Sequence, residues 1–247
     1  MSKIYEALKK AEQERERSRW AGQPAGVTPP ADRDATAAAP AANAVDEDYQ
    51  QLRASLVSGG SPSDLHTILV TAARHGEGAT TVAVGLAAAL AKERETRVLL
   101  IEGNVRMPSL SRLLPNSANG GLSEFLSGKA TAEEIIARVE ALNLSIIVAG
   151  NATRGPLQLE QTATLLARLR PQFDFIVIDA PPVNRYADTS IMAPKVDGVI
   201  LVVEADRTPV TEAEMAKRQL DKIDARILGV VLNRRRSYIP AFLESLL

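Results

Sequence analysis

Residues 68–92 constrain the fold of this chain more than any other stretch, because they combine an apolar run, a glycine loop and a helix start. The stretch reads ILVTAARHGEGATTVAVGLAAALAK. Its first residues are of the kind that is buried in a parallel sheet, and Gly76 and Gly78 let the backbone turn sharply beside a ligand. Thr80 and Thr81 then open an alanine-rich helix. This order predicts a phosphate-binding loop, in which backbone N–H groups and a helix N-terminus face an anion.

The loop departs from the usual phosphate-binding pattern at its most important side chain. That pattern is G-x-x-x-x-G-K-[ST], whereas residues 73–80 read A-R-H-G-E-G-A-T, so that Ala79 takes the lysine position. We therefore expect a backbone that can hold phosphate without the charge of the lysine. Thr80 is expected to bind Mg²⁺ rather than only to cap the helix. The residues predicted to contact a nucleotide are Arg74, His75, Gly76, Glu77, Gly78, Ala79, Thr80 and Thr81.

Two further apolar runs end in polar side chains that should meet this loop. Residues 97–101 (RVLLI) lead into Glu102 and Asn104, and residues 173–178 (FDFIVI) lead into Asp179. Ligands of open parallel sheets lie outside the carboxyl ends of the strands, where an Asp orders Mg²⁺ or its water. Glu102 either binds the metal or caps its own loop. The predicted metal ligands are Thr80, Glu102 and Asp179.

The remainder of the chain alternates strands with helices. Thr131 and Glu134 form a capping box, which favours a helix over residues 131–140. The other predicted helices are 45–57, 120–128, 157–169, 188–193 and 208–223, and the other strands are 144–149, 198–203 and 227–232. Such alternation indicates a parallel sheet with helices on both faces. The predicted fold class is α/β: a doubly wound, mainly parallel sheet in a three-layer sandwich, with a helical N-terminal extension.

Three segments follow one another along the chain. Residues 1–20 form a charged helix with a narrow apolar stripe of Ile4, Leu8 and Ala11. The stripe favours either a solvated extension or a docking helix for a partner. Residues 21–44 contain ten Ala and four Pro, which is typical of a flexible linker because little apolar surface can be buried. The folded domain is predicted over residues 45–247.

Composition excludes several classes of function. The net charge of −1 gives no support to nucleic-acid binding, and the absence of cysteine excludes disulfides and thiolate chemistry. No apolar run is long enough for a transmembrane helix, and the N-terminus lacks the apolar core of a signal peptide. We therefore expect a cytoplasmic protein.

These motifs together resemble the bacterial tyrosine kinases of capsular and exopolysaccharide biosynthesis, a family of P-loop ATPases with deviant Walker motifs. The family's loop T-S-x-x-P-G-E-G-K-S-T is similar to residues 71–81, TAARHGEGATT. Its second motif I-D-A-D-x-R-x-P is similar to residues 101–108, IEGNVRMP, and its third, F-D-x-I-x-I-D-x-P-P, is kept whole at residues 173–182. The opening MSKIYEALKKAE resembles members linked to exosortase-type exopolysaccharide loci.

The resemblance implies ATP or ADP with Mg²⁺ as ligands, a catalytic Asp179, and a contact of Asn233 with the nucleotide base. It also implies a membrane partner, namely a polysaccharide co-polymerase, chain-length or export protein, which would bring the chain to the inner face of the plasma membrane. The family's oligomer-forming helix E-x-x-R-x-x-R corresponds to Glu47, Gln50 and Arg53, so one arginine is replaced. We therefore expect at most a weak homo-oligomer.

The departures from the family fall at the reacting centre. Ala79 replaces the lysine, Glu102 and Asn104 replace the two aspartates of the second motif, and Tyr238 is all that is left of the C-terminal tyrosine cluster. This pattern predicts a kinase-like protein with impaired catalysis that regulates its membrane partner. Asp179, Glu102 and Asn104 are then a degenerate catalytic set.

Two other functions stay open at this stage. The first is an active ATPase or protein-tyrosine kinase in which Arg74, or a residue of a partner, replaces the lost lysine. The second is a partition- or septum-positioning ATPase, against which the stretches GLSEFLSG and FDFIVIDAPPV argue. Residues 234–236 are three arginines followed by an apolar tail. They either contact acidic lipid headgroups, form a solvated turn, or lead into a packed terminal helix.

Overall fold

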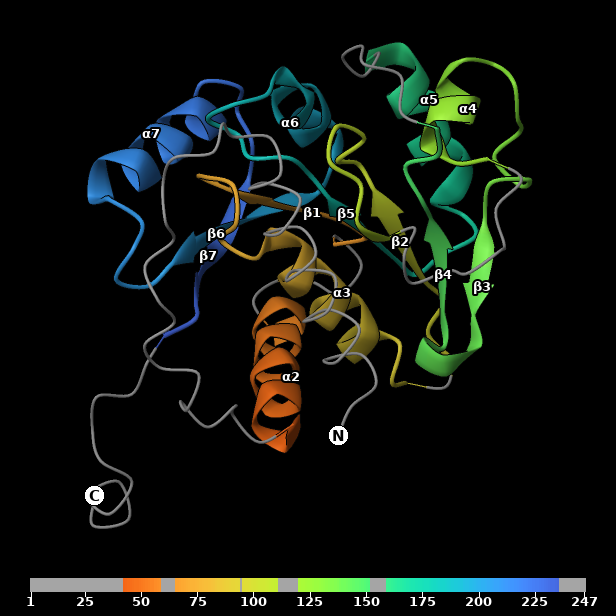
Figure 1. Cartoon of the computed structure of the whole chain (residues 1–247). Coiled ribbons are helices and arrows are strands. Elements are labelled where there is room, and N and C mark those ends of the chain that lie inside the picture. Colours follow the sequence, from red (N-terminus) through yellow and green to blue (C-terminus); the bar gives the residue numbers. More distant parts are fainter. Residues whose placement is uncertain (1–41, 59–64, 94, 111–119, 152–158, 236–247) are drawn as a thin grey trace, which may run out of the picture.

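The computed structural model describes residues 42–58, 65–93, 95–110, 120–151 and 159–235. Over these residues the chain forms a seven-stranded sheet with the order β3-β4-β2-β5-β1-β6-β7 (Figure 1). The strands are β1 (Thr67–Ala72), β2 (Val98–Glu102), β3 (Ala137–Val139), β4 (Leu144–Ile147), β5 (Phe175–Asp179), β6 (Gly198–Glu204) and β7 (Ile227–Asn233). The α-helices are α2 (Ala42–Ser58), α3 (Ala79–Leu90), α4 (Leu122–Leu126), α5 (Leu159–Leu169), α6 (Ala187–Met192) and α7 (Val210–Asp221).

The sheet has the predicted class. Every pairing of neighbouring strands is parallel except that of β3 with β4. The central strands β1, β2 and β5 are almost entirely buried and mainly apolar, as expected for strands that are covered on both faces. Glu102 and Asp179 are the last residues of β2 and β5 rather than the first residues of the following loops.

The predicted helix over residues 131–140 is wrong. The capping contacts do form: the backbone N–H of Thr131 donates to the Glu134 carboxylate at 2.8 Å. However, only turns follow, and residues 137–139 become the antiparallel edge strand β3. A short 3₁₀-helix (Glu140–Leu142) then returns the chain into β4.

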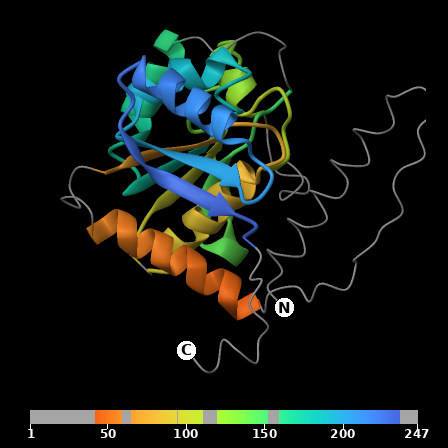
Figure 2. The ribbon, with the colours of Figure 1, turned by 90° about the vertical axis from the view of Figure 1, so that its left-hand side faces the viewer.

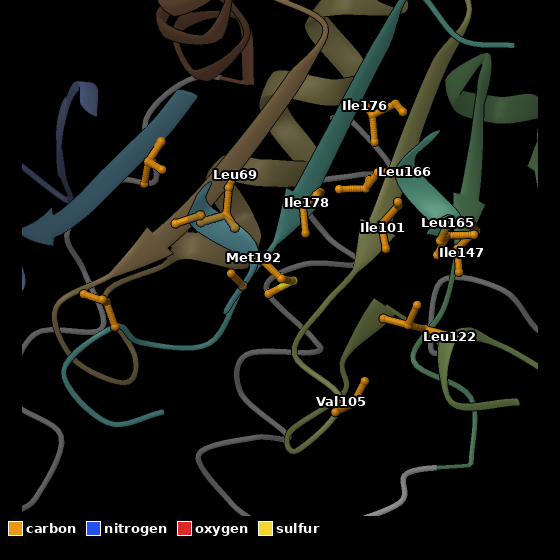
Figure 3. Packing of buried hydrophobic residues seen from close by; sticks show 14 of the residues in the cluster. Leu69, Ile101, Val105, Leu122, Ile147, Leu165, Leu166, Ile176, Ile178 and Met192 are labelled. Carbon is orange, nitrogen blue, oxygen red and sulfur yellow. The ribbon is translucent and has the colours of Figure 1, made fainter. Parts of the chain in front are cut away.

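Two hydrophobic clusters cover the two faces of the sheet. One cluster joins β1 and β2 to α3 and to Leu52 and Leu56 of α2. The other packs side chains of α5, α6 and α7 against alternate residues of β1, β2 and β5. Leu69, Ile178 and Met192 belong to this cluster (Figure 3). The result is a three-layer sandwich, with α2 and α7 on opposite sides of the sheet (Figure 2).

Helix α2 is joined to α3 by a close contact. The ring of Tyr49 lies against Gly85, where a Cβ atom would overlap it, and the Tyr49 hydroxyl donates to the Thr81 carbonyl at 3.3 Å. The helix begins at Ala42, so the predicted linker 21–44 is three residues too long at its end. Alanine has the highest helix propensity, which allows the helix to continue into the alanine-rich segment.

Several predictions concern residues outside the described ranges. The charged helix 1–20, most of the linker, and the tail with Tyr238 belong there and stay predictions. Within the described ranges, no helix is long and apolar enough to cross a membrane.

Candidate functional site

The phosphate loop connects β1 to α3 at the carboxyl edge of the sheet. Gly76 and Gly78 have φ angles of 86° and 91°, in the left-handed region that favours glycine. Gly78 is also required by space, because a Cβ atom there would overlap the side-chain amide of Asn233. The Val82 N–H donates to the Gly78 carbonyl at 3.0 Å, so the loop runs directly into the first turn of α3. This conformation fits the anion-binding role predicted for the loop.

Glu77 braces the loop from inside. Its side chain is buried, and the carboxylate accepts the backbone N–H of Arg74 at 2.8 Å and the hydroxyl of Thr208 at 2.6 Å. The sequence motif predicts Glu77 as a nucleotide contact, whereas in the structure its carboxylate ties the loop to itself and to the segment after β6. The sequence does not predict this role of Thr208, because Thr208 lies 131 residues from Glu77 and outside the loop motif.

Thr80 and Asp179 meet as the sequence predicts. The Thr80 hydroxyl donates to the Asp179 carboxylate at 2.8 Å, and Asp179 is almost completely buried at the end of β5. Among the described residues no group of three or more His, Asp or Glu could hold a metal by itself. The pair nevertheless fits Mg²⁺, because this ion usually takes only one or two protein oxygens and completes its shell with phosphate and water.

Glu102 is bound differently from a metal ligand. Its side chain is completely buried, and one carboxylate oxygen accepts the backbone N–H groups of Ser109 and Leu110, the latter at 2.6 Å. The other oxygen accepts the N–H of Ala149 at 2.9 Å. These three bonds join the second-motif loop to the segment after β4, and they support the loop-capping alternative for Glu102.

Asn104 also makes a local contact. It is 4% exposed, and its side-chain oxygen accepts the N–H of Met107 at 3.3 Å. This bond stabilises the turn of the second-motif loop, as Asx side chains commonly do. An amide cannot accept a proton as a carboxylate does, so Asn104 offers the site no general base.

Next to the phosphate loop lies a cluster of aromatic and charged side chains that no sequence motif predicts. His75 Nε2 lies 3.2 Å from the Tyr186 hydroxyl, with the two rings edge to face. The guanidinium of Arg106 lies over the same tyrosine ring at 5.2 Å and donates to the buried Asp188 at 2.8 Å. The cluster joins the phosphate loop to the second-motif loop and to the segment after β5. These residues are far apart in the sequence and meet only in the folded protein.

The end of β7 also reaches the loop. The Asn233 amide donates to the Glu77 carbonyl at 2.8 Å, and Arg234 Nη1 donates to the Gly76 carbonyl at 2.9 Å. Asn233 therefore lies beside the phosphate loop and binds the loop backbone, and its contact with a nucleotide base stays a prediction. Arg74, the cation that the sequence suggests as a substitute for lysine, is an exposed residue, and Ala79 is half-buried at the start of α3.

A family model and individual protein sequences both match this chain. Residues 65–243 match a family model described as ParA: NUBPL iron-transfer P-loop NTPase. The tyrosine-protein kinase CpsD of Streptococcus pneumoniae serotype 4 is 32% identical over 178 residues, which cover 70% of this chain and 78% of CpsD.

Solved structures agree with these sequence matches. The crystal structure of the VpsO kinase domain is 30% identical with a TM-score of 0.68, covering 78% of this chain and 98% of that domain. The chimerical protein CapA2B2 is 28% identical with a TM-score of 0.70, covering 77% of this chain and 85% of the chimera. Both the predicted fold class and the predicted resemblance are thereby confirmed. The chain belongs to the ParA-like P-loop NTPases and, among these, to the family of the bacterial tyrosine kinases.

Proposed function

We propose that this chain is a kinase-like P-loop protein of capsule or exopolysaccharide biosynthesis that does not turn over ATP and regulates a membrane chain-length or export protein. The observation that carries the proposal is the state of the second motif. Glu102 is engaged by three backbone N–H groups, and Asn104 is an amide within a turn. Together with Ala79 in the loop, this leaves Asp179 as the only carboxylate of the predicted catalytic set that contacts Thr80.

The chemistry explains why these changes matter. In phosphoryl transfer the protein mainly positions groups and neutralises the charge of the transferred phosphoryl. A lysine on the phosphates does both, whereas the methyl group of Ala79 does neither. The loss of one such preorganised donor typically lowers the rate by roughly 10²–10³. Because catalytic groups act as a unit, repair of one position need not restore the rate.

Nucleotide binding is compatible with this proposal. The N–H groups of the phosphate loop and the N-terminus of α3 would hold the phosphates, and the oxygens of Thr80 and Asp179 would hold Mg²⁺. When bound, ATP with Mg²⁺ would supply an activated phosphoryl group. In this chain the loop would act as a binding site whose occupancy is sensed by a partner.

Phosphate release tests the lack of turnover. The purified full chain with Mg·ATP should release no phosphate above background and should not autophosphorylate. Ala79→Lys should improve nucleotide binding more than rate, and turnover should require Ala79→Lys, Glu102→Asp and Asn104→Asp together. Robust hydrolysis by the wild type that disappears in Asp179→Asn would contradict the proposal and would restore the active kinase or ATPase alternative.

The partner is tested by deleting residues 1–20. The apolar stripe of this segment, connected by a long tether, would raise the local concentration of a docking helix near a membrane protein. The deletion should leave the melting temperature nearly unchanged and should reduce recovery of the co-expressed membrane partner. A deletion that unfolds the domain would instead assign the segment to the core.

A further inference from the structure

Arg234 is the first residue after β7, and its side chain crosses to the phosphate loop. Its Nη1 atom donates to the Gly76 carbonyl at 2.9 Å. The preceding residue, Asn233, donates to the adjacent carbonyl of Glu77 at 2.8 Å. Two consecutive side chains from the end of one strand therefore hold two consecutive carbonyls of the loop.

The backbone at Arg234 is adapted to this contact. Its φ angle is 57°, in the left-handed region that non-glycine residues seldom occupy. The Arg234 N–H donates to the Asn233 side-chain oxygen at 2.9 Å, which helps to hold this conformation. Strained backbone of this kind persists where the surrounding structure requires it, and it concentrates at functional sites.

Arg234 shares a carboxylate with a second guanidinium group. Glu204 Oε1 lies 3.4 Å from Arg234 Nη1 and 3.2 Å from Arg207 Nη1, so two guanidinium groups share one carboxylate. The Glu77 carboxylate of the same loop accepts hydrogen bonds from the Arg74 N–H and the Thr208 hydroxyl. The Arg234 guanidinium thus lies at the rim of a loop that lacks the usual lysine, and it shares the Glu204 carboxylate with Arg207.

We infer that Arg234 supplies the positive charge for a polyphosphate ligand that Ala79 cannot supply. The ligand class is a nucleoside di- or triphosphate with Mg²⁺, bound by the loop N–H groups. The inference rests on the proposed function in one respect, namely that the loop still binds nucleotide. It replaces Arg74 as the substitute cation, because the Arg234 guanidinium contacts the loop itself.

Titration of the full chain with Mg·ATP, Mg·ADP, Mg·pyrophosphate and adenosine tests the inference. Arg234→Ala should weaken Mg·ATP binding about tenfold, weaken Mg·ADP and Mg·pyrophosphate less, and leave any binding of adenosine unchanged. Arg234→Gln should behave in the same way, because it keeps a donor for Gly76 but loses the charge. Arg235→Ala is the matched control, and it should change each dissociation constant less than twofold. Equal effects of Arg234→Ala and Arg235→Ala would overturn the inference.

A double-mutant cycle separates charge supply from simple bracing of the loop. If Arg234 acts as the missing cation, Arg234→Ala should cost only about twofold in the Ala79→Lys background, since the lysine then provides the charge. A brace without an electrostatic role would cost the same factor in both backgrounds, and this result would contradict the inference. Thermal unfolding of each variant shows that the compared proteins are folded, and Arg234→Lys should recover most of the affinity.

The outcomes also distinguish this inference from the proposed function. A wild-type chain that binds none of the phosphate ligands would overturn the inference but not the regulatory role, which is measured through recovery of the membrane partner. Robust turnover by the wild type would overturn the impaired role, whereas the dependence of affinity on Arg234 would stand.

Discussion

One methylene separates Glu102 from the aspartate of the motif that this chain resembles, and the extra length changes what the carboxylate reaches. Its oxygens accept the backbone N–H groups of Ser109, Leu110 and Ala149. Hydrogen bonds to a charged group each contribute about 1.5–3 kcal/mol, and unpaired buried donors carry a similar penalty. We therefore regard Glu102 as a residue that holds two segments together at the edge of the site.

Glu102→Gln tests this role at almost constant size. The new amide must direct an N–H group at a backbone N–H, so the variant should lose roughly 2–3 kcal/mol of folding free energy and about 5–10 °C in melting temperature. Glu134→Gln is the control, because Glu134 also accepts a backbone N–H but is exposed; it should shift the melting temperature by less than about 2 °C. Unchanged stability of Glu102→Gln, combined with a loss of Mg²⁺-dependent nucleotide binding, would identify Glu102 as a metal ligand instead.

The sequence predicted which residues at strand ends lie together at the site. It did not predict contacts between loops that are far apart in the chain. The meeting of Thr80 with Asp179 follows from the rule that the carboxyl ends of parallel strands share one edge. The contact of Arg234 with Gly76 spans 158 residues and depends on the register of β7 and on a left-handed backbone. No local pattern encodes either property, so the sequence pointed to Arg74 and missed Arg234.

At the scale of elements, the segment after α4 shows how tertiary pairing overrides a local signal. The capping box at Thr131 and Glu134 forms, and such a cap contributes about 1 kcal/mol. The strand β3 instead pairs with β4, with Ala137 opposite Ile146, while Ile135 becomes buried. The pairing of β3 with β4 and the burial of Ile135 stabilise the observed structure over several residues. A capping pattern in the sequence contains no information about either. The long apolar strands and the strongly periodic helices were, in contrast, predicted to within a few residues.

Asp197 connects three elements, and it gives a prediction that depends on pH. Its carboxylate accepts the backbone N–H groups of His66 and Thr67 at 3.0 and 2.7 Å and pairs with Arg170 after α5. Burial alone would raise the pKa of Asp197, but the hydrogen bonds from Arg170, Thr67 and His66 together lower the pKa below its usual value. A lowered pKa means that the folded state favours the charged carboxylate. The stabilisation is therefore present above the unfolded pKa of about 3.9 and is lost as the pH falls through the lower folded value.

Asp197→Asn should thus lower the melting temperature at pH 7, and the gap to the wild type should narrow as the pH falls below about 4. Thermal unfolding of both proteins from pH 7 to below pH 3 measures this gap. Asp221→Asn removes a carboxylate that pairs with Lys217 at 2.6 Å on the exposed face of α7, and it should have little effect at any pH. A gap that stays constant or widens on acidification would show that the charge of Asp197 does not stabilise the fold.

At the scale of the whole molecule, the side chains of α2 give a prediction about how copies of the chain associate. The sequence resemblance implies that a glutamate and two arginines of this helix would bridge neighbouring copies in a ring. In this chain Gln50 takes one arginine position, and its amide nitrogen is buried without an acceptor among the described residues. The other position, Arg53, forms an ion pair with Glu93 beyond the end of α3. Both positions are therefore turned toward the protein itself.

We expect the wild type to be a monomer or a small oligomer at micromolar concentration. Gln50→Arg together with Glu93→Gln should raise the average mass, because the first change restores a charge and the second frees Arg53 from its partner within the chain. Light scattering after size exclusion measures the mass at several protein concentrations and at low and high salt, which should weaken any ring that depends on these charges. Gln50→Arg together with Glu95→Gln is the matched control, because it makes the same change of net charge without affecting the Arg53 pair. A stable ring of the wild type, or equal masses for the two double variants, would contradict this account of α2.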